Sequence, residues 1–213
     1  MPPTAYVVDD DESIRALWRW LMESNGIAVQ TFAAASEFIA SYDPDAPGCL
    51  LLDLRLPGMS GLELQEHLKR QGIDIPIVFV TGHGDIPTAV RALKGGAIDY
   101  IQKPFGYREM LSIVEKAFRR DAGVREQQAQ RAQVEARVAA LTERELEMLR
   151  RVIDGKPNRV IAAELAISTK TVEFHRARMM EKMGVDSVAG LVQLTLGFSL
   201  VDAQPSERAF ERS

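Results

Sequence analysis

Residues 49–53 read Cys49-Leu50-Leu51-Leu52-Asp53, an apolar run that ends at a carboxylate. A second run, Ile77-Val78-Phe79-Val80, ends in a similar way at the hydroxyl of Thr81. Strands that are apolar along their whole length are typical of the centre of a parallel sheet that helices cover on both faces. The two runs therefore predict a parallel α/β fold with polar side chains where two central strands end.

The first 120 residues extend this pattern on both sides of the two runs. We expect strands at residues 5–8, 28–32, 49–52, 75–80 and 98–101. We expect helices near residues 13–24, 34–42, 60–71, 87–95 and 107–119. Five successive strand–helix units predict a doubly wound, five-stranded parallel sheet. The functional crevice of such a sheet lies beyond the carboxyl ends of its strands.

Polar side chains gather at this predicted edge of the sheet. Asp9 and Asp10 follow the first strand, and Asp53 follows the third. Clustered carboxylates repel one another unless a cation neutralises them, and hard oxygen ligands suit Mg²⁺. A carboxylate can also attack phosphorus and form an aspartyl phosphate. Thr81, which ends the fourth strand, and Lys103, which follows the fifth, can each contact a phosphoryl oxygen.

The remainder of the chain has a helical pattern. Residues 121–140 predict a helical linker, because Val124–Ala140 lacks glycine and proline and is rich in Gln, Ala, Arg and Glu. A mobile polar tether is the alternative. An all-α domain of four short helices follows at residues 141–200, with helices expected near 142–154, 158–165, 169–183 and 187–196. Residues 201–213 have few apolar side chains and predict a loose tail.

Two local patterns define this second domain. Thr142 and Glu145 form a capping-box pattern, which marks the start of a helix. Residues 160–168 read as a helix, a tight turn and a new N-cap at Ser168. The helix after Ser168 is therefore expected to be the recognition helix of a helix-turn-helix, which enters the major groove of DNA.

Composition agrees with an ordinary globular protein. The chain has 213 residues and a net charge of −4, from 26 basic and 30 acidic side chains. Cys49 is the only cysteine, which excludes an intrachain disulfide and a cysteine-based metal cluster. No apolar run approaches the roughly 18 residues of a membrane span, and the N-terminus has no pattern of a secretory signal. We therefore expect a cytoplasmic protein without a membrane partner.

The N-terminal domain, residues 1–120, resembles the receiver domain of two-component response regulators, which has a flavodoxin-like fold. Four stretches carry the resemblance: Val7-Val8-Asp9-Asp10-Asp11, Leu52-Asp53-Leu54-Arg55-Leu56-Pro57-Gly58-Met59-Ser60-Gly61, Val80-Thr81-Gly82-His83-Gly84-Asp85 and Gly95-Gly96-Ala97-Ile98-Asp99-Tyr100-Ile101-Gln102-Lys103-Pro104-Phe105. By this resemblance Asp53 would accept the phosphoryl group. Asp10, Asp53 and the backbone carbonyl of Arg55 would ligate Mg²⁺, with Asp9 acting directly or through a water.

The same resemblance implies how the pocket would signal to the surface. Thr81 and Tyr100 would form a switch pair, and Lys103 would contact the phosphoryl group through a loop with a cis peptide bond between Lys103 and Pro104. A phosphoryl group adds charge and acceptor oxygens that can draw Thr81 inward, and Tyr100 would fill the space that this leaves. The surface at residues 85–100 is therefore expected to form a dimer interface.

Residues 138–200 resemble the LuxR-type helix-turn-helix, and the whole arrangement is similar to the FixJ-like subgroup of the NarL family. The matching stretches are Leu141-Thr142-Glu143-Arg144-Glu145, Lys156-Pro157-Asn158-Arg159-Val160-Ile161-Ala162 and Ser168-Thr169-Lys170-Thr171-Val172-Glu173-Phe174-His175-Arg176. The candidate DNA contacts are Lys170, Thr171, Glu173, Phe174, His175, Arg176, Ala177 and Arg178. Relatives often carry a basic residue in place of Glu173, so the family's base preference does not transfer to this chain.

Together these features predict a transcriptional regulator rather than an enzyme. A sensor histidine kinase would phosphorylate Asp53, and phosphorylation would promote homodimerisation and binding to promoter DNA, with RNA polymerase as a further partner. Two alternatives stay open. One is a DNA-binding regulator that works without phosphorylation. The other is an aspartyl-phosphate phosphatase of the haloacid-dehalogenase type, although that family's nucleophile lies on the first strand and Asp53 would then go unexplained.

Overall fold

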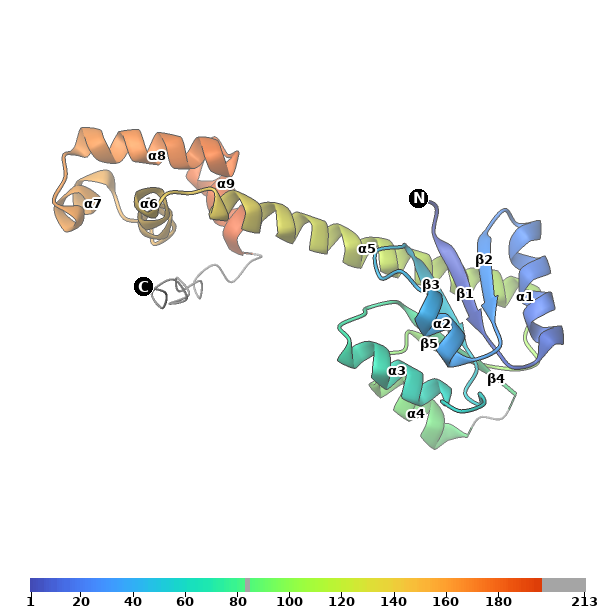
Figure 1. Ribbon diagram of the computed structural model, residues 1–213. Helices are drawn as coiled ribbons and strands as arrows, with labels where there is room; N and C mark the ends of the chain where they lie inside the picture. The colour runs from blue at the N-terminus through green and yellow to red at the C-terminus, as the bar shows by residue number, and fades with distance from the viewer. Residues whose placement is uncertain (83–84, 197–213) are drawn as a thin grey trace, which may run out of the picture. The chain divides into compact units, whose positions relative to one another are not determined.

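The computed structural model describes residues 1–82 and 85–196, which belong to two compact units, Met1–Arg125 and Glu126–Ser213. The first unit contains a five-stranded parallel sheet with the strand order β2-β1-β3-β4-β5. Its strands are β1 (Thr4–Val8), β2 (Ala28–Phe32), β3 (Gly48–Leu52), β4 (Ile77–Thr81) and β5 (Asp99–Gln102). Its helices are α1 (Glu12–Ser24), α2 (Ala35–Ser41), α3 (Gly61–Arg70), α4 (Ile86–Lys94) and the first part of α5 (Tyr107–Ala139). The predicted doubly wound fold is confirmed (Figure 1).

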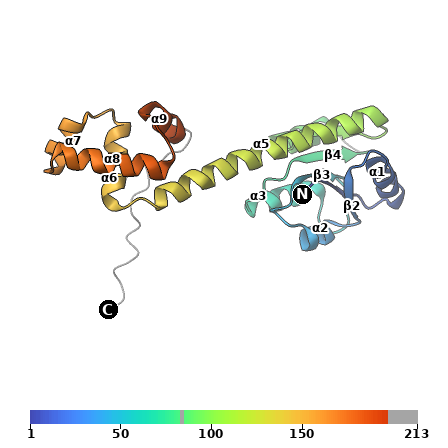
Figure 2. The same cartoon turned by 90° about the horizontal axis from the view of Figure 1, so that it is seen from above.

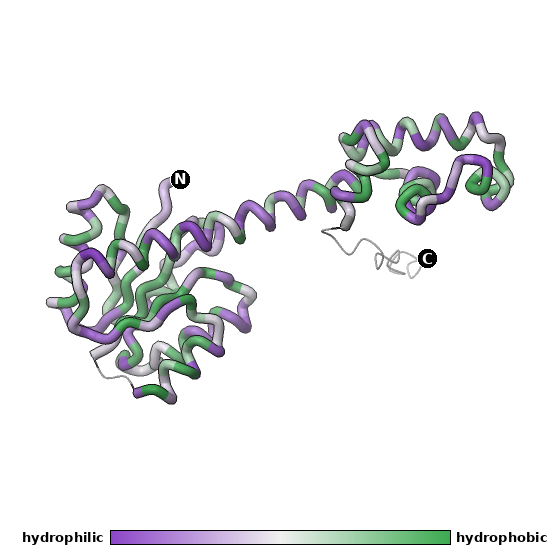
Figure 3. Tube along the Cα trace, turned by 180° about the vertical axis from the view of Figure 1, so that it is seen from behind, coloured by the Kyte–Doolittle hydropathy of each residue, from purple (hydrophilic) through white to green (hydrophobic). Residues whose placement is uncertain are grey.

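The two faces of the sheet are covered by different helices. One core cluster joins alternate residues of β3, Cys49 and Leu51, to side chains of α1 and α5. The other joins Leu50 and Leu52 to side chains of α2, α3 and α4. Figure 2 shows α2 and α5 on opposite sides of the sheet, and Figure 3 shows the hydrophobic residues concentrated along the strands. Because β3 and β4 are buried along their full length, their carboxyl ends are held rigidly.

The start of β4 differs from the expectation by two residues. The apolar pattern predicts a strand from Ile75, but β4 begins at Ile77. Pro76 lies between them and has no amide hydrogen to donate to the ladder. Its carbonyl still accepts a hydrogen bond from the backbone N–H of Leu50, at 2.9 Å. The chain therefore follows the sheet before it pairs as a strand.

Helix α5 joins two predicted helical segments. The sequence predicts a helix near 107–119 and a helical linker at 121–140 that can continue it, and the structure has a single helix from Tyr107 to Ala139. Asp121 is buried in this helix and accepts hydrogen bonds from the Gly48 backbone N–H (3.0 Å) and from Arg125 Nε (2.9 Å). Arg125 also donates to the backbone carbonyls of residues 44, 45 and 46. These contacts extend the N-terminal unit to Arg125.

The second unit has the four helices that the sequence predicts. They are α6 (Glu143–Ile153), α7 (Asn158–Leu165), α8 (Thr169–Met183) and α9 (Val188–Leu196). The turn between α7 and α8 passes through Ala166 in the left-handed region (φ 53°), and the Ser168 side chain caps α8. One core cluster joins the four helices and includes Met148, Ile161 and Val172. The predicted tail at residues 201–213 lies outside the described residues.

The start of α6 carries an ion pair as well as the predicted capping box. The Thr142 side chain accepts from the Glu145 backbone N–H, and the Glu145 carboxylate accepts from the Thr142 backbone N–H, so the capping box is confirmed. The buried Glu145 carboxylate also accepts from Lys182 Nζ at 2.6 Å. Lys182 further donates to the Ala140 carbonyl at 3.1 Å. These bonds hold the C-terminal end of α8 against the start of α6.

Glu145→Gln is expected to destabilise the C-terminal unit by roughly 1–2 kcal/mol at pH 7, because the ionic hydrogen bond with Lys182 is lost. The hydrogen bonds from Lys182 and from the Thr142 backbone lower the pKa of Glu145 to about 2. A carboxylate whose pKa is lowered by folding stabilises the folded state at pH values above its unfolded pKa of about 4.3. This contribution is lost as the pH falls toward the pKa of the folded state. The difference between Glu145→Gln and wild type should therefore shrink between pH 4 and pH 2. This stability difference is measured from the urea midpoints of the NMR amide signals of α6 and α8 in the full chain. Glu143→Gln, at an exposed position, is the control.

None of the helices in residues 1–82 and 85–196 has the length and apolarity that a membrane span requires.

Candidate functional site

The predicted polar cluster assembles at the carboxyl edge of the sheet. Val8 and Leu52 are partners in the register of β1 and β3, so Asp9 and Asp53 leave the sheet side by side. The Asp53 backbone N–H donates to the Val8 carbonyl at 2.9 Å and continues the ladder by one bond. The side chains of Asp9, Asp53 and Thr81 are all buried. Buried polar side chains are costly unless they are paired, so their gathering at one edge points to a site.

Lys103 carries the positive charge of this site. Its Nζ lies 2.5 Å from Asp9 Oδ2 and 3.7 Å from Asp53 Oδ1. The peptide bond from Lys103 to Pro104 is cis, as the resemblance implies, and the Lys103 backbone N–H donates to the Thr81 carbonyl at 2.8 Å. Burial raises the pKa of Asp9, while the hydrogen bond from Lys103 opposes that shift. The ammonium therefore partly compensates two buried carboxylates.

The two carboxylate oxygens of Asp53 differ in their hydrogen bonding. Its Oδ2 accepts from the Arg55 backbone N–H at 3.1 Å. Its Oδ1 is buried and has no hydrogen-bond partner among residues 1–82 and 85–196. An oxygen in this state costs free energy unless a ligand pairs with it. The Asp53 carboxylate is thus suited to a cation or to an incoming electrophile.

Asp10 is placed differently from its neighbours. Its side chain is exposed, whereas those of Asp9 and Asp53 are buried. Within the described ranges, no group of three or more His, Cys, Asp or Glu side chains is arranged to hold a metal ion. The structure therefore brings Asp9 and Asp53 together at Lys103 and leaves Asp10 at the rim. The donor set still fits a hard cation, because the carboxylates outnumber the single ammonium and Asp53 Oδ1 accepts no hydrogen bond from the described residues.

Two residues that support this pocket are absent from the sequence prediction. Gly61 begins α3, and a Cβ there would lie 2.2 Å from the Asp53 carbonyl oxygen, so only glycine permits this close approach. Arg15 on α1 donates to the carbonyls of Asp9 and Asp10. Gly61 lies within a quoted stretch, but the contact itself has no sequence signal. The sequence shows that Arg15 is a cation six residues after Asp9, but it does not predict the bonds to the two carbonyls.

Tyr100 lies on β5 opposite Phe79 of β4, two residues before Thr81, the last residue of β4. The Tyr100 hydroxyl oxygen is buried and lacks a hydrogen-bond partner in the part of the chain that the structure describes. Burial raises the pKa of Tyr100, and the charges of Asp85 and Asp53 raise it further. A buried hydroxyl without a partner is poorly satisfied in this state. A conformation that gives the Tyr100 hydroxyl a hydrogen-bond partner would therefore be favoured over this one.

The candidate DNA contacts lie along α8 with unequal exposure. Lys170, Glu173, Phe174, Ala177 and Arg178 are exposed, and Thr171, His175 and Arg176 are partly buried. The Phe174 side chain is 57% exposed, and the Arg178 guanidinium carbon lies 5.6 Å from its ring centroid. The rings of His175 and Phe174 also form a T-shaped pair, with the centroids 5.6 Å apart. Phe174 is thus an exposed aromatic braced by two cationic or polar neighbours.

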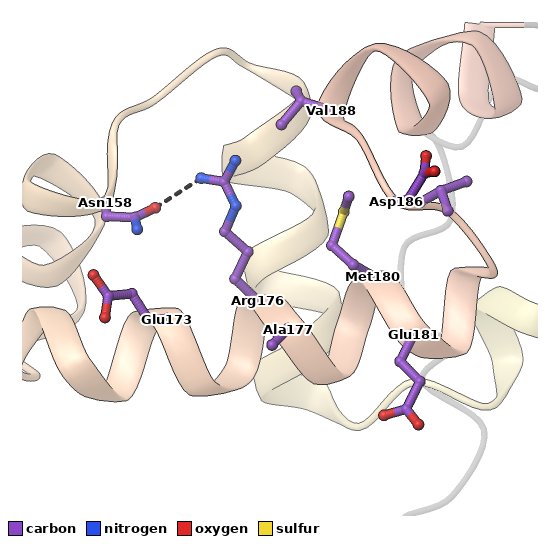
Figure 4. Close-up of a pocket in the computed structure, with 9 residues that line it drawn as sticks. Asn158, Glu173, Arg176, Ala177, Met180, Glu181, Asp186 and Val188 are labelled. Atoms are coloured by element: carbon purple, nitrogen blue, oxygen red, sulfur yellow. Dashed lines mark hydrogen bonds between the residues drawn. The ribbon is translucent and has the colours of Figure 1, made fainter.

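Arg176 is engaged within the unit. Its Nη1 donates to Asn158 Oδ1 on α7 at 2.7 Å, as Figure 4 shows. Both residues line a hollow of about 500 Å³ beside α8, together with three carboxylates from Glu173, Glu181 and Asp186. The three carboxylates would repel the phosphate backbone of DNA at this point. Lys182 is also exposed on α8 but pairs with Glu145, so the exposed cations of α8 that remain available to a polyanion are those of Lys170 and Arg178.

Comparison with known proteins agrees with both halves of this description. Residues 5–115 match the model of the response regulator receiver domain, and residues 139–195 match that of bacterial regulatory proteins of the luxR family. Nodulation protein W of Bradyrhizobium diazoefficiens is 44% identical over 91% of this chain and 86% of its own length. The transcriptional regulatory protein FixJ of Rhizobium meliloti is 40% identical over 91% of this chain and 95% of its own.

Solved structures give the same result. The response regulator StyR superposes with a TM-score of 0.86 at 44% identity, covering 93% of this chain and all of that one. Full-length FixJ from B. japonicum gives a TM-score of 0.57 at 37% identity, with coverage of 92% and 96%. The parallel sheet with its acidic pocket, the helical second unit and these matches lead to one assignment: the chain belongs to the response regulators of two-component systems that join a receiver domain to a LuxR-type DNA-binding domain.

Proposed function

We propose that a sensor histidine kinase phosphorylates Asp53, and that phosphorylation promotes homodimerisation and binding to promoter DNA. The observation that carries this proposal is the buried Asp53 carboxylate, whose Oδ1 accepts no hydrogen bond from the described residues and lies 3.7 Å from the Lys103 ammonium. In this proposal residues 1–120 form the receiver domain, residues 121–140 form the linker, whose first five residues belong to the compact N-terminal unit, and residues 141–200 form the DNA-binding domain. A regulator of promoters works in the cytoplasm, where the DNA lies.

In the proposed transfer, an Asp53 oxygen attacks the phosphorus of a phosphohistidine. An O–P bond forms, the P–N bond breaks, and the imidazole leaves with the electron pair of that bond. Lys103 pairs with an oxygen of the transferred group. Asp9, Asp10, Asp53 and the Arg55 carbonyl would hold Mg²⁺, which supplies charge neutralisation for the carboxylates and the phosphoryl oxygens.

The switch in this proposal uses Thr81 and Tyr100. The new phosphoryl oxygens accept a hydrogen bond from the Thr81 hydroxyl, which draws that side chain toward Asp53. Tyr100 then moves into the vacated space, where its buried and unpartnered hydroxyl can find a partner. Because β5 and α4 are neighbours, the rearrangement reaches the surface at residues 85–100.

The dimer surface in this proposal is an apolar stripe on α4. Ile86, Val90 and Leu93 recur at the i, i+4 and i+7 spacing of one helix face, and they are 82%, 43% and 47% exposed. An exposed apolar stripe on a small domain is typical of an interaction surface. Cations at Arg91 and Lys94 flank it. The same stripe on a second copy is the partner that this arrangement favours, because a two-fold interface pairs a surface with itself.

The DNA surface in this proposal is the exposed side of α8. Lys170 and Arg178 contact phosphates of the DNA. The edges of this surface are formed by Thr171, Glu173, His175 and Arg176. Phe174 and Ala177 lie where a helix in the major groove meets base edges, and an apolar ring there contacts the 5-methyl group of thymine. The Glu173 carboxylate can accept from the N4 amino group of cytosine. RNA polymerase is the further partner that a promoter-bound regulator needs.

Phe174→Ala is expected to remove a preference for thymine. A buried methyl group contributes about 0.8 kcal/mol, so replacing the contacted thymine with uracil should weaken wild-type binding roughly fourfold. Phe174→Ala should bind the two duplexes equally. Fluorescence anisotropy on duplexes selected from a random pool by the full chain measures this. Lys170→Ala, which removes a phosphate contact, should weaken both duplexes and keep their ratio. An unchanged ratio in Phe174→Ala would exclude the contact.

Acetyl phosphate with Mg²⁺ tests the phosphorylation step itself. We expect one phosphoryl group per chain, bound to Asp53 and lost slowly, as the acyl phosphate of a regulator. Intact-mass measurement and peptide mapping locate the label. Many turnovers on a phosphomonoester would instead support the phosphatase alternative and overturn the proposal.

A further inference from the structure

Arg15 makes two short bonds to the main chain of the acidic loop. Its Nη1 donates to the carbonyl oxygens of Asp9 and Asp10, each at 2.8 Å. Asp9 is buried and Asp10 is exposed, and both precede α1, which carries Arg15. A guanidinium normally pairs with a carboxylate fork, so two backbone carbonyls on one nitrogen are a specific arrangement.

The rest of the loop is held by its own side chains. The Asp11 backbone N–H donates to Asp9 Oδ1 at 3.0 Å, and the Ser13 backbone N–H donates to Asp11 Oδ1 at 2.8 Å. The second bond is the N-cap of α1. The loop between β1 and α1 is thus tied to the helix at both ends, by Asp11 at the cap and by Arg15 from the next turn.

We propose that Arg15 is a positioning residue, which fixes the β1–α1 loop so that Asp9 and Asp10 present their carboxylates to Mg²⁺. This inference rests on the proposed function, in which the pocket binds that ion. Arg15 acts through the backbone of the two aspartates and touches neither the ion nor the phosphoryl group. Partners that orient metal ligands in this way typically change metal affinity by 10- to 100-fold when they are removed.

Charge and position predict opposite effects of removing Arg15. A guanidinium near the pocket repels a dication, so loss of its charge alone would tighten Mg²⁺ binding. Loss of the two backbone bonds releases the loop, so the ligands must be ordered at the moment of binding, which weakens it. The sign of the change in affinity therefore separates positioning from electrostatics.

Calorimetric Mg²⁺ titration of the full chain, without a phosphoryl donor, measures that sign. We expect Arg15→Gln to raise the Mg²⁺ dissociation constant roughly tenfold, and Arg15→Lys, which keeps the charge and one donor group, to raise it less. Arg19→Gln is the matched control. Arg19 lies one turn further along α1 and donates to the Thr31 hydroxyl on β2 instead of the carbonyls of Asp9 and Asp10. It should leave the dissociation constant unchanged.

Hydrogen exchange gives a second readout that needs no metal. The Asp11 amide, which donates to Asp9 Oδ1, should exchange faster in Arg15→Gln and at the wild-type rate in Arg19→Gln. An unchanged or lower Mg²⁺ dissociation constant in both Arg15 variants would overturn the inference, whatever their stability. If the wild-type chain itself binds no Mg²⁺, the proposed metal site fails instead. The two failures are therefore distinguishable.

Discussion

Asp53→Asn should bind DNA with the same affinity whether or not acetyl phosphate and Mg²⁺ are present. The wild-type chain should gain roughly 10- to 100-fold in affinity under the same conditions, the range that coupling between two sites commonly gives. Asparagine keeps the size of the side chain and an oxygen for the Arg55 N–H, but its amide is not a nucleophile toward phosphorus. The substitution thus removes the chemistry and keeps the local packing.

Fluorescence anisotropy on a duplex selected by the phosphorylated wild-type chain measures both affinities. Asp45→Asn is the matched control, because the Asp45 side chain is exposed in the loop before β3, at the opposite edge of the sheet from Asp53. It should gain as much affinity as wild type. If Asp53→Asn gains it too, the protein is a regulator that works without phosphorylation, and the switch through Thr81 and Tyr100 has no role.

Much of the receiver fold follows from features that are local in the sequence. The uninterrupted apolar runs of β3 and β4 require burial on both faces, and that requirement alone leads to a parallel sheet with helices on both sides. The position of Asp9 and Asp53 after their strands then follows from topology, since parallel strands end at one edge. The capping box at Thr142 is equally local, as its two partners are three residues apart.

What the sequence could not predict depends on contacts between distant residues. The extension of the N-terminal unit to Arg125 depends on bonds from Arg125 and Asp121 to the loop before β3, more than seventy residues earlier. Arg15 shows the same limit at short range. Its bonds to two carbonyls need the exact path of the β1–α1 loop, and no residue pattern specifies that path. The sequence predicts Asp10 beside Asp9 by adjacency, yet only Asp9 is buried, because β1 ends at Val8 and the chain leaves the sheet before α1.

Val90→Asp is expected to abolish the phosphorylation-dependent dimer while leaving phosphorylation of Asp53 intact. Val90 is the middle residue of the α4 stripe, between Ile86 and Leu93. In a two-fold interface each copy would bury one added carboxylate in the middle of the apolar stripe, at a cost of about 2 kcal/mol or more per copy. The combined cost in the two copies corresponds to a rise of roughly 1,000-fold in the dimer dissociation constant. Sedimentation of the acetyl phosphate-treated chain measures it, and intact mass confirms the label.

Leu17→Asp separates a specific interface from a general effect of surface charge. Leu17 on α1 is 44% exposed and Val90 on α4 is 43% exposed, so the two substitutions remove apolar side chains of similar exposure and add the same charge. Leu17→Asp should dimerise like wild type. Loss of the dimer in both variants would mean that added negative charge opposes association wherever it lies. Retention of the dimer in Val90→Asp would place the interface away from α4, and the link from Tyr100 to that surface would have to be abandoned.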